Sequence, residues 1–365
     1  MKKRNLALLT SGLVLGLTAC GIEQDDNNGG TNAAENNGNN NTNNAAENDS
    51  NDNSNNNVLD IDETFEVTYS TWASEGEPAY QGMEHFKEMI EERSGGNITI
   101  EIYPANQLGS TIEQMEQVST GTIEMMSSGD PGLDEIEYLS LPFLMASNDH
   151  WMEVLESDTG QEFNQKLIDD QGLRTIGILP RGPRVISSNV KIETPEDMSG
   201  LSIRAPAVDY YVATFEALGA SPNPMDFGEV YNGLQTGIVE GQENPLETIY
   251  SAGFHEVQDY IINSNHMYKP AFVTINNEFF ESMPEEYQDL FLEAAEEGEQ
   301  VATDKLLENE ADMIQEMEDS GVEFVDPDIE AFKEATQSVR DEMGTEVWGE
   351  ETYQEIVEIG QSDLN

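Results

Sequence analysis

The chain has 365 residues and carries 73 Asp and Glu against 15 Lys and Arg, which gives a formal net charge of −58 at pH 7. Nucleic acids and anionic lipid headgroups are polyanions, so this charge argues against both as binding partners. Cys20 is the only cysteine, which excludes an intramolecular disulfide and a cysteine-based zinc site. The excess of carboxylates fits a surface that stays hydrated at high salt, where screening shortens charge repulsion, and we therefore expect a saline habitat.

The N-terminus has the pattern of a secretory signal peptide. Basic residues at positions 2–4 precede a short apolar run at 6–17, which is too short to cross about 30 Å of hydrocarbon as a permanent helix. The run ends in Leu-Thr-Ala-Cys, which resembles a bacterial lipobox. We predict a lipoprotein signal peptide over residues 1–20 and a lipid anchor on Cys20 that holds the protein at the outer face of the cytoplasmic membrane. The alternative is an ordinary buried thiol.

Residues 21–57 are rich in Asn, Gly, Asp and Glu and contain almost nothing apolar. Such a segment buries too little surface to offset its ordering entropy, and it lacks the spacing of a calcium-binding loop, so we predict a disordered tether. From Val58 onward the composition is that of a folded protein of roughly 300 residues, long enough for two domains. Removal of residues 1–20 leaves 12 basic residues against 73 acidic ones, a net charge of −61.

The first part of the folded region alternates predicted strands with predicted amphipathic helices. Apolar residues recur at helical spacing between residues 77 and 96, where Gly95 and Gly96 end the predicted helix. A second helix is predicted at residues 110–121. The predicted strands around them are residues 64–72, 97–104 and 122–129. This order predicts an α/β domain with parallel strands.

The second part of the folded region ends in one long helical pattern. The elements predicted before it are strands at 173–180 and 201–206, a helix at 209–220, a helix, a stop at Gly237 and a short strand within 227–245, and a strand followed by a turn within 272–283. Residues 284–321 then form a helical pattern longer than an ordinary globular helix. This pattern is compatible with two helices, a coiled-coil segment or one long helix that crosses two lobes.

The sequence contains none of the motifs that indicate common enzyme classes. The four histidines lack the spacing of zinc-protease motifs, and there is no G-x-S-x-G elbow, phosphate-binding loop or G-x-G-x-x-G turn. Pairs of carboxylates are too frequent in so acidic a chain to indicate glycosidase chemistry. We therefore predict a protein that is not an enzyme and that holds neither a metal ion nor a cofactor.

Half of the twelve basic residues beyond position 20 gather within 39 residues of the chain. They are Lys166, Arg174, Arg181, Arg184, Lys191 and Arg204. Arg184 and Arg204 each follow an apolar strand-like segment, and loops at strand ends are where open α/β sheets bind ligands. The planar guanidinium group suits a buried carboxylate, because it makes two parallel charge-assisted hydrogen bonds. The alternative is that both arginines form structural ion pairs, and spacing alone does not separate the two interpretations.

Polar and aromatic residues near these arginines are candidates for the rest of a pocket. Asn244 precedes Pro245, which favours an extended or turn conformation in which its amide donates to a ligand oxygen. Trp72 ends a predicted strand, and Phe227 and the pair Tyr210–Tyr211 flank the Arg204 segment. Binding pockets are mostly apolar with a few polar groups. The alternatives are an Asx turn at Asn244 and core positions for the aromatic residues.

These segments together resemble a known family. Residues 201–266, from LSIRAP through PMDFGEV and GQENP to SNH, are similar to the signature region of solute-binding proteins of TRAP (tripartite ATP-independent periplasmic) transporters. The segments IYPANQLGS, LSLPFL and EFFESMPEEYQDLFLEAA match the same family in order, and the resemblance covers residues 64–345. It implies the dicarboxylate-, sialic-acid- or sugar-acid-binding type of this family, here in lipoprotein form.

The resemblance implies an α/β fold like that of type II periplasmic binding proteins. Two lobes enclose a ligand cleft, and one long helix spans both lobes. On this basis we expect lobe I to comprise residues 58–181 and 270–309, and lobe II to comprise residues 182–269 and 310–365. The ligands of the family are small organic anions, and the lobes close over them.

The resemblance also assigns roles to residues of lobe II. Arg204, in the element Ile-Arg-x-Pro, matches the arginine that forms the central salt bridge with the ligand carboxylate. Arg184 matches a second arginine of the family site, Asn244 matches the asparagine of GQENP, and Phe227 matches the aromatic residue of Pro-Met-x-Phe. Arg181 matches no family position, and we expect it to pair with an acid.

Contacts from lobe I are expected in the loop after the first strand, at Trp72, Ser74 and Glu75, and near residues 107–110. The predicted partners are a small organic anion, the membrane permease and the membrane through the lipid anchor, with the protein acting as a monomer. Uronates and other sugar acids, C4-dicarboxylates and hydroxy acids all suit the same arginine, and the presence of Arg184 favours a more anionic ligand. The alternatives are a compatible solute such as ectoine, whose cationic ring would meet Glu75, and a sensor or enzyme subunit that uses the same cleft.

Overall fold

The computed structural model describes residues 58, 59 and 61–359. The predicted signal peptide, Cys20 and the predicted tether lie outside the described residues, as do residues 360–365 at the end of predicted lobe II. Within residues 61–359 no helix is both long and apolar enough to cross a membrane.

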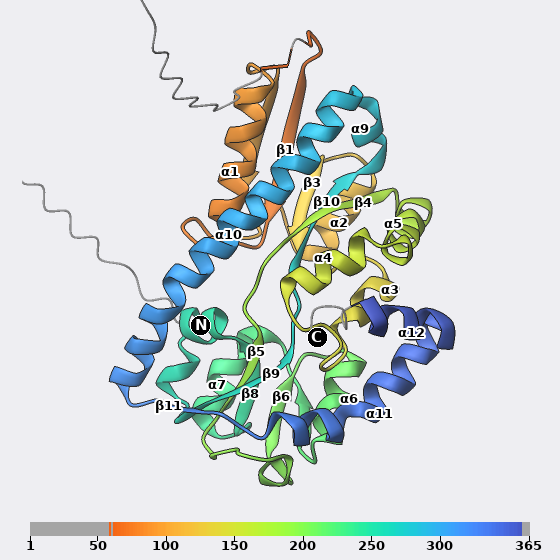
Figure 1. The fold of residues 1–365 in the computed structure, drawn as a ribbon. Helices are drawn as coiled ribbons and strands as arrows, with labels where there is room; N and C mark the ends of the chain where they lie inside the picture. The colour runs from red at the N-terminus through yellow and green to blue at the C-terminus, as the bar shows by residue number, and fades with distance from the viewer. Residues whose placement is uncertain (1–57, 60, 360–365) are drawn as a thin grey trace, which may run out of the picture. The chain divides into compact units, whose positions relative to one another are not determined.

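The first of two sheets carries the N-terminal strands (Figure 1). Its order is β2-β1-β3-β10-β4, with bounds β1 Phe65–Thr71, β2 Ile98–Tyr103, β3 Met125–Ser128, β4 Leu173–Leu179 and β10 Ala271–Asn276. We call the part of the molecule built on this sheet lobe I. The parallel arrangement predicted from the sequence is correct for β1 with β2 and β3. The strand β10, for which the sequence predicted no orientation, runs antiparallel to β3 and β4 because the chain enters it on its return from the other sheet.

Helices cover the first sheet, and their ends follow the expected cap signals. They are α1 Pro78–Arg93, α2 Thr111–Ser119, α3 Asp134–Glu137, α4 Asn148–Glu156, α5 Asp158–Gln171 and α9 Asn277–Ser282, with a 3-10 turn at Tyr138–Ser140. After α1 the backbone takes positive φ angles at Gly95 and Gly96, as the predicted helix stop requires. The α9 segment was predicted as a turn. It is a short helix because Asn276 caps it, accepting a hydrogen bond from the Phe279 amide at 2.8 Å.

The second sheet carries the segment that holds the predicted arginines, and we call the part built on it lobe II. Its order is β11-β9-β5-β8-β6-β7, with bounds β5 Arg184–Ser188, β6 Ser202–Ala205, β7 Ser221–Pro224, β8 Gly241–Pro245, β9 Tyr260–Met267 and β11 Glu323–Val325. The helices are α6 Asp209–Ala217, α7 Val230–Thr236 and α8 Leu246–Ser251, with 3-10 turns at Pro195–Met198, Phe227–Glu229 and Phe254–Glu256. The strand β5 is antiparallel to β8 and β9, so this sheet is mixed as well.

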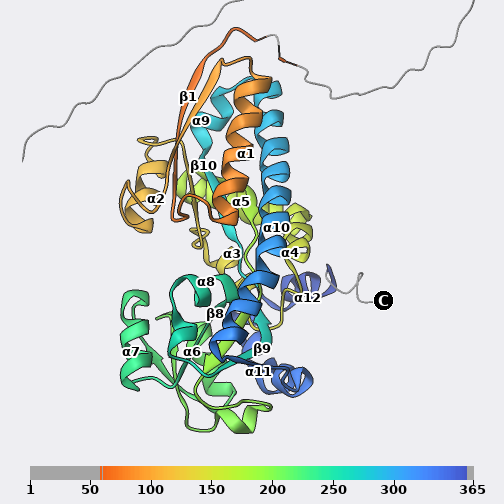
Figure 2. The ribbon, with the colours of Figure 1, turned by 90° about the vertical axis from the view of Figure 1, so that its left-hand side faces the viewer.

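The long helical pattern forms one continuous helix, α10 Glu285–Ser320, of 36 residues. It packs against α1 and β4 in lobe I and against α8 in lobe II, as Figures 1 and 2 show. Its contact with α1 is close, because a Cβ atom added at Gly82 would overlap the carbonyl oxygen of Gly298. Two further helices, α11 Ile329–Trp348 and α12 Glu350–Ile359, follow α10.

The chain passes between the two sheets in three places. The first is the segment 180–183 between β4 and β5, the second is the segment 268–270 between β9 and β10, and the third is α10. Buried apolar residues form clusters under both sheets, including Trp151 and Phe272 in one and Phe86 and Phe291 in another. The crossings place the start of β5 and the end of β9 at the junction of the lobes. The residue boundaries predicted for the lobes stay a prediction.

Candidate ligand-binding cleft

A cleft of about 940 Å³ opens at the junction of the lobes. Every ligand-binding residue predicted from the sequence lines it: Trp72, Ser74, Glu75, Arg184, Arg204, Phe227 and Asn244. These residues come from the loop after β1 in lobe I and from four separate segments of lobe II. The residues 107–110, near which a further lobe I contact was expected, are not part of the lining.

Arg204 is the third residue of β6 and is 4% exposed. Its Nε donates a hydrogen bond to the carbonyl oxygen of Met225 at 2.9 Å, which holds the guanidinium plane against the end of β7. Burial lowers the pKa of this guanidinium, although an arginine stays protonated throughout the physiological range. Arg204 therefore presents a fixed positive charge to the cleft.

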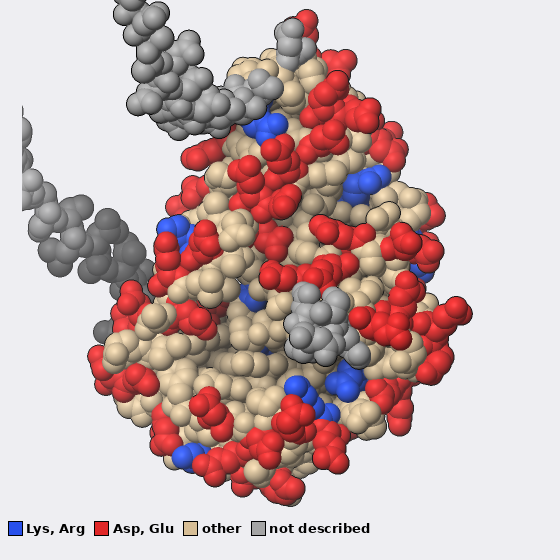
Figure 3. All heavy atoms as spheres, in the orientation of Figure 1, with Lys and Arg blue, Asp and Glu red and all other residues tan. Residues whose placement is uncertain are grey.

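Arg204 differs from every other described cation because no carboxylate of residues 58, 59 and 61–359 lies within 4.0 Å of it. Of the 15 Lys and Arg, all but those at positions 2–4 lie in the described residues, and eleven of these twelve are within 4.0 Å of an Asp or Glu oxygen. The face shown in Figure 3 is covered by acidic side chains with few basic ones among them. Glu243 and Asp226 attract its charge from a distance, but no carboxylate of the described residues contacts the guanidinium, which leaves its donors available on the cleft side.

Arg184 forms a buried ion pair. Its Nε and Nη2 donate to the two carboxylate oxygens of Glu243, the latter at 2.8 Å, and Nη2 also donates to Asn244 Oδ1 at 3.0 Å. The guanidinium lies 5.3 Å from the ring centroid of Tyr211. Although burial alone lowers the pKa of Arg184, the Glu243 carboxylate raises it above its usual range. Nη1 is left without a hydrogen-bond partner among the described residues.

The position of Arg184 differs from the prediction that it ends a strand. It is the first residue of β5, and the antiparallel register with β8 sets it opposite Pro245. That register brings Glu243 and Asn244 alongside the arginine although they are 59 and 60 residues away in sequence. Arg184 therefore lies in the cleft wall with most of its charge already neutralised.

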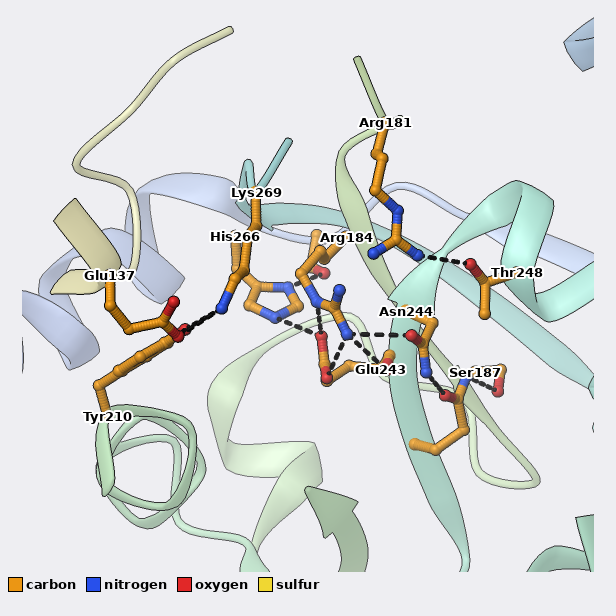
Figure 4. A network of polar contacts seen from close by, with 12 residues as sticks. Glu137, Arg181, Arg184, Ser187, Tyr210, Glu243, Asn244, Thr248, His266 and Lys269 are labelled. Atoms are coloured by element: carbon orange, nitrogen blue, oxygen red, sulfur yellow. Dashed lines mark hydrogen bonds and ion pairs between the residues drawn. The ribbon is translucent and has the colours of Figure 1, made fainter. Parts of the chain in front are cut away.

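His266 lies beside the Arg184–Glu243 pair and is fully buried (Figure 4). Its Nδ1 is 2.8 Å from the hydroxyl of Ser264, and its Nε2 is 3.7 Å from Glu243 Oε2. Burial lowers the pKa of His266 to about 4, so the ring is neutral at physiological pH. The histidine thus packs against the Arg184–Glu243 pair without adding charge to it.

Asn244 is extended, as predicted, and is buried in β8. Its Nδ2 donates to Gln242 Oε1 at 2.6 Å, and its Oδ1 accepts from Arg184. Gln242 in turn donates to the hydroxyl of Ser187 at 2.9 Å. The network fixes the orientation of the amide, and donation to a ligand oxygen stays a prediction.

Two further cations, which were not predicted from the sequence as ligand-binding residues, also line the cleft. Arg181, in the crossing between β4 and β5, pairs with Glu247 at 3.7 Å and donates to the hydroxyl of Thr248 at 3.0 Å. The expectation that it pairs with an acid is confirmed, but it is also part of the cleft wall. Lys269, in the crossing between β9 and β10, forms an ion pair with Glu137. Nothing in the segment HMYKP indicated this position.

Aromatic side chains form the apolar part of the wall. Phe227 is 47% exposed and packs on Phe254, with ring centroids 5.6 Å apart, so a large apolar face is open to the cleft. Tyr211 stacks on Tyr210 with centroids 4.6 Å apart, and both are buried, which agrees with the alternative of core positions for this pair. Only Tyr211 of the two reaches the lining.

The chain is similar to known bacterial binding proteins in both sequence and structure. The profile of the family described as bacterial extracellular solute-binding protein, family 7, matches residues 69–346. The 2,3-diketo-L-gulonate-binding periplasmic protein of Escherichia coli is 32% identical over 263 residues, which is 70% of this chain and 80% of that protein.

Two solved structures of TRAP periplasmic solute-binding proteins resemble the whole described region. One, from Ochrobactrum anthropi, has its C-terminus bound in the ligand pocket. It is 28% identical, with a TM-score of 0.77 over 83% of this chain and 98% of that one. The other, from Roseobacter denitrificans with bound L-galactonate, is 30% identical, with a TM-score of 0.67 over 81% of this chain and 98% of that one. The chain therefore belongs to the extracytoplasmic solute-binding proteins of TRAP transporters, which bind small organic acids for membrane permeases and are not enzymes.

Proposed function

We propose that this protein captures a small organic carboxylate by pairing it with Arg204 and delivers it to the permease of a TRAP transporter. The supporting observation is that Arg204 alone, among the twelve cations of the described region, has no carboxylate within 4.0 Å. A buried guanidinium that no carboxylate contacts is stabilised by an anionic ligand, because a planar carboxylate satisfies its charge and two of its donors together.

Arg184 and Asn244 complete the carboxylate site in this proposal. The Arg184–Glu243 pair leaves Nη1 as the donor available to the ligand, and Glu243 holds that donor in place. Phe227 supplies an apolar surface for the carbon skeleton of the ligand. Trp72, Ser74 and Glu75 approach the ligand from lobe I when the lobes close.

Closure of the lobes makes the arginine contacts stronger. Expulsion of water lowers the local dielectric constant, and the attraction between opposite charges rises in inverse proportion to it. The ligand carboxylate then contributes to holding the lobes together, so the closed form is populated only when the cleft is filled. The permease recognises this closed form in the proposed cycle.

The ligand is proposed to be a sugar acid, such as a uronate, or a C4-dicarboxylate, and the protein is proposed to act as a monomer. The diketogulonate- and galactonate-binding relatives support the first of these classes. Anchoring through lipidated Cys20 is part of the same proposal. Fractionation of cells that express wild type or Cys20→Ser tests it, because the variant is expected to leave the membrane fraction.

The binding proposal is tested by calorimetric titration of organic acids into wild type, Arg204→Ala and Arg204→Lys. Removal of one partner of a desolvated charge pair costs about 2–5 kcal/mol, so Arg204→Ala is expected to bind at least 30-fold more weakly. Arg204→Lys keeps the charge but loses the bidentate geometry and is expected to fall between the two. Arg174→Ala is the control, because Arg174 pairs with Glu281 outside the cleft lining. Wild-type affinity in Arg204→Ala would contradict the proposal.

A further inference from the structure

A ligand with two carboxylates needs two cations of the cleft that are free to pair with it. The lining provides fewer free cations than its composition suggests. The lining contains the cations Arg181, Arg184, Arg204 and Lys269 and the carboxylates Glu75, Glu77 and Glu247. Four cations near one ligand would suit a strongly anionic molecule. The partners of these cations lead to a different conclusion.

Three of the four cations are already neutralised by carboxylates of the protein. Arg184 is held by Glu243 with side chains 5% and 0% exposed, and Lys269 by Glu137 with side chains 12% and 17% exposed. Lys269 also lies 3.1 Å from the hydroxyl of Tyr210, which donates to the same Glu137 oxygen at 2.8 Å. Because Arg184 and Glu243 are buried and Lys269 and Glu137 are half-buried, release of either cation toward a ligand would leave a poorly solvated carboxylate without its counterion.

Arg181 is the third neutralised cation. Its guanidinium lies 3.7 Å from Glu247, and its side chain is 19% exposed. It also donates to the Thr248 hydroxyl (Figure 4). Glu247 lines the same cleft, so the pair adds no net charge to it. Arg204 is thus the only one of the four whose charge is available to a ligand.

Two carboxylates of the lining have no cationic partner. Glu75 and Glu77 lie in the exposed loop between β1 and α1, and neither has a Lys, Arg or His within 4.0 Å among the described residues. Glu77 lies close enough to Glu247 for the two carboxylates to repel each other. The lobe I side of the cleft is therefore electronegative, and it faces the lobe that carries Arg204.

From this distribution we propose that the cleft selects a ligand with a single carboxylate whose other polar groups are hydrogen-bond donors, and that it rejects dicarboxylates. One carboxylate is met by Arg204, and hydroxyl or cationic groups at the far end donate to Glu75 and Glu77. A second carboxylate at the far end would meet two like charges and no free cation. This inference rests on the proposed carboxylate-binding function and narrows it to one class of ligand.

Matched pairs of acids test the proposal in calorimetric titrations at about 0.1 M ionic strength, where the Debye length of about 10 Å leaves contacts within the cleft largely unscreened. The pairs are galactonate with galactarate, gluconate with glucarate, and 4-hydroxybutyrate with succinate, in which a terminal alcohol is replaced by a carboxylate. At least one monoacid is expected to bind, and its diacid about 10- to 100-fold more weakly, because the second carboxylate lies close to like charges at the lobe I wall.

Two cleft variants and one control show which carboxylates cause the preference for a monoacid over its diacid. In Glu75→Gln/Glu77→Gln the ratio of monoacid to diacid affinity is expected to fall about 10-fold. The control is Glu66→Gln/Glu88→Gln, which changes the charge equally at exposed residues outside the lining. Its affinity ratio is expected to stay within about 2-fold of wild type. Glu247→Gln frees Arg181 and is expected to lower the ratio as well. An unchanged ratio in both cleft variants overturns the assignment.

The failures of the two proposals are distinguishable. Arg204-dependent binding of a diacid as tight as that of its monoacid overturns the single-carboxylate inference and leaves the proposed function standing. Failure of every monoacid and diacid to bind, or binding that does not depend on Arg204, overturns both.

Discussion

Glu243 holds Arg184 through two hydrogen bonds between adjacent antiparallel strands, and neither side chain is more than 5% exposed. Removal of the carboxylate leaves an arginine buried without a counterion. Glu243→Ala is therefore expected to lower the free energy of unfolding by about 3–5 kcal/mol, measured by urea denaturation. Glu193→Ala, which removes an exposed carboxylate paired with Lys191, is the control and is expected to change it by less than about 1 kcal/mol. Equal stability of the two variants would show that the buried pair is not needed for folding.

His266 is expected to make the stability of the protein depend on pH. Its pKa is lowered from 6.5 to about 4 by burial, so the unfolded chain binds more protons than the native one between these values. Stability is fully present above pH 6.5 and is lost as the pH falls toward 4, by about 3 kcal/mol from this group. The loss is expected to be smaller in His266→Gln, in urea denaturation at pH 7 and pH 4.5. The same loss in both proteins would assign it to other groups.

Glu299 on α10 is expected to act in the opposite sense. Burial, together with repulsion from Asp149, Glu296 and Glu156, raises its pKa from 4.5 to about 7. Between pH 4.5 and 7 the folded protein holds a proton on Glu299 that the unfolded chain has released. The contribution of this group to the free energy of unfolding is therefore fully present below pH 4.5 and is lost as the pH rises through 7. Glu299→Gln is expected to stabilise the protein at pH 8, by about 1–2 kcal/mol once screening is considered, and to leave it unchanged at pH 4. Thermal unfolding at both pH values and low salt measures the difference.

The contact between α1 and α10 depends on two glycines. A Cβ at Gly82 would overlap the backbone of Gly298, so Gly82→Ala forces the helices apart and is expected to cost about 1–3 kcal/mol. Gly228→Ala is the matched control, because nothing lies within 4 Å of its added Cβ and its φ is not positive. Chemical denaturation of both variants is the measurement. A smaller cost for Gly82→Ala than for Gly228→Ala would show that the helices accommodate the methyl group.

The sequence contains enough local information to predict most elements of the fold and many residues of the site. Apolar periodicity predicted α1 and β2. The motif around Arg204 led through family resemblance to Phe227 and Asn244, and these three residues line one cleft. The elements and the positions of these residues in the cleft wall could be predicted because the spacing of short motifs is set by single elements, whereas their contacts with a ligand stay a prediction.

Contacts between distant segments could not be predicted in this way. Glu243 lies 59 residues from Arg184, and Glu137 lies 132 residues from Lys269, so only strand register and lobe packing bring the partners together. Because the sequence does not show that Glu243 pairs with Arg184, the charge of this arginine looked available to a ligand. In so acidic a chain, the sequence does not reveal which carboxylate neutralises which cation.

The acidic surface has a consequence for the speed of ligand capture. An anion that approaches a protein of net charge −58 is repelled at long range, and it is attracted by Arg204 only after it has entered the cleft. Salt shortens the Debye length from about 10 Å at 0.1 M to about 3 Å at 1 M, which removes the long-range repulsion. The association rate constant, measured by stopped-flow fluorescence, is therefore expected to rise with ionic strength, the reverse of the usual behaviour for oppositely charged partners. High salt would then speed the association of the protein with its ligand.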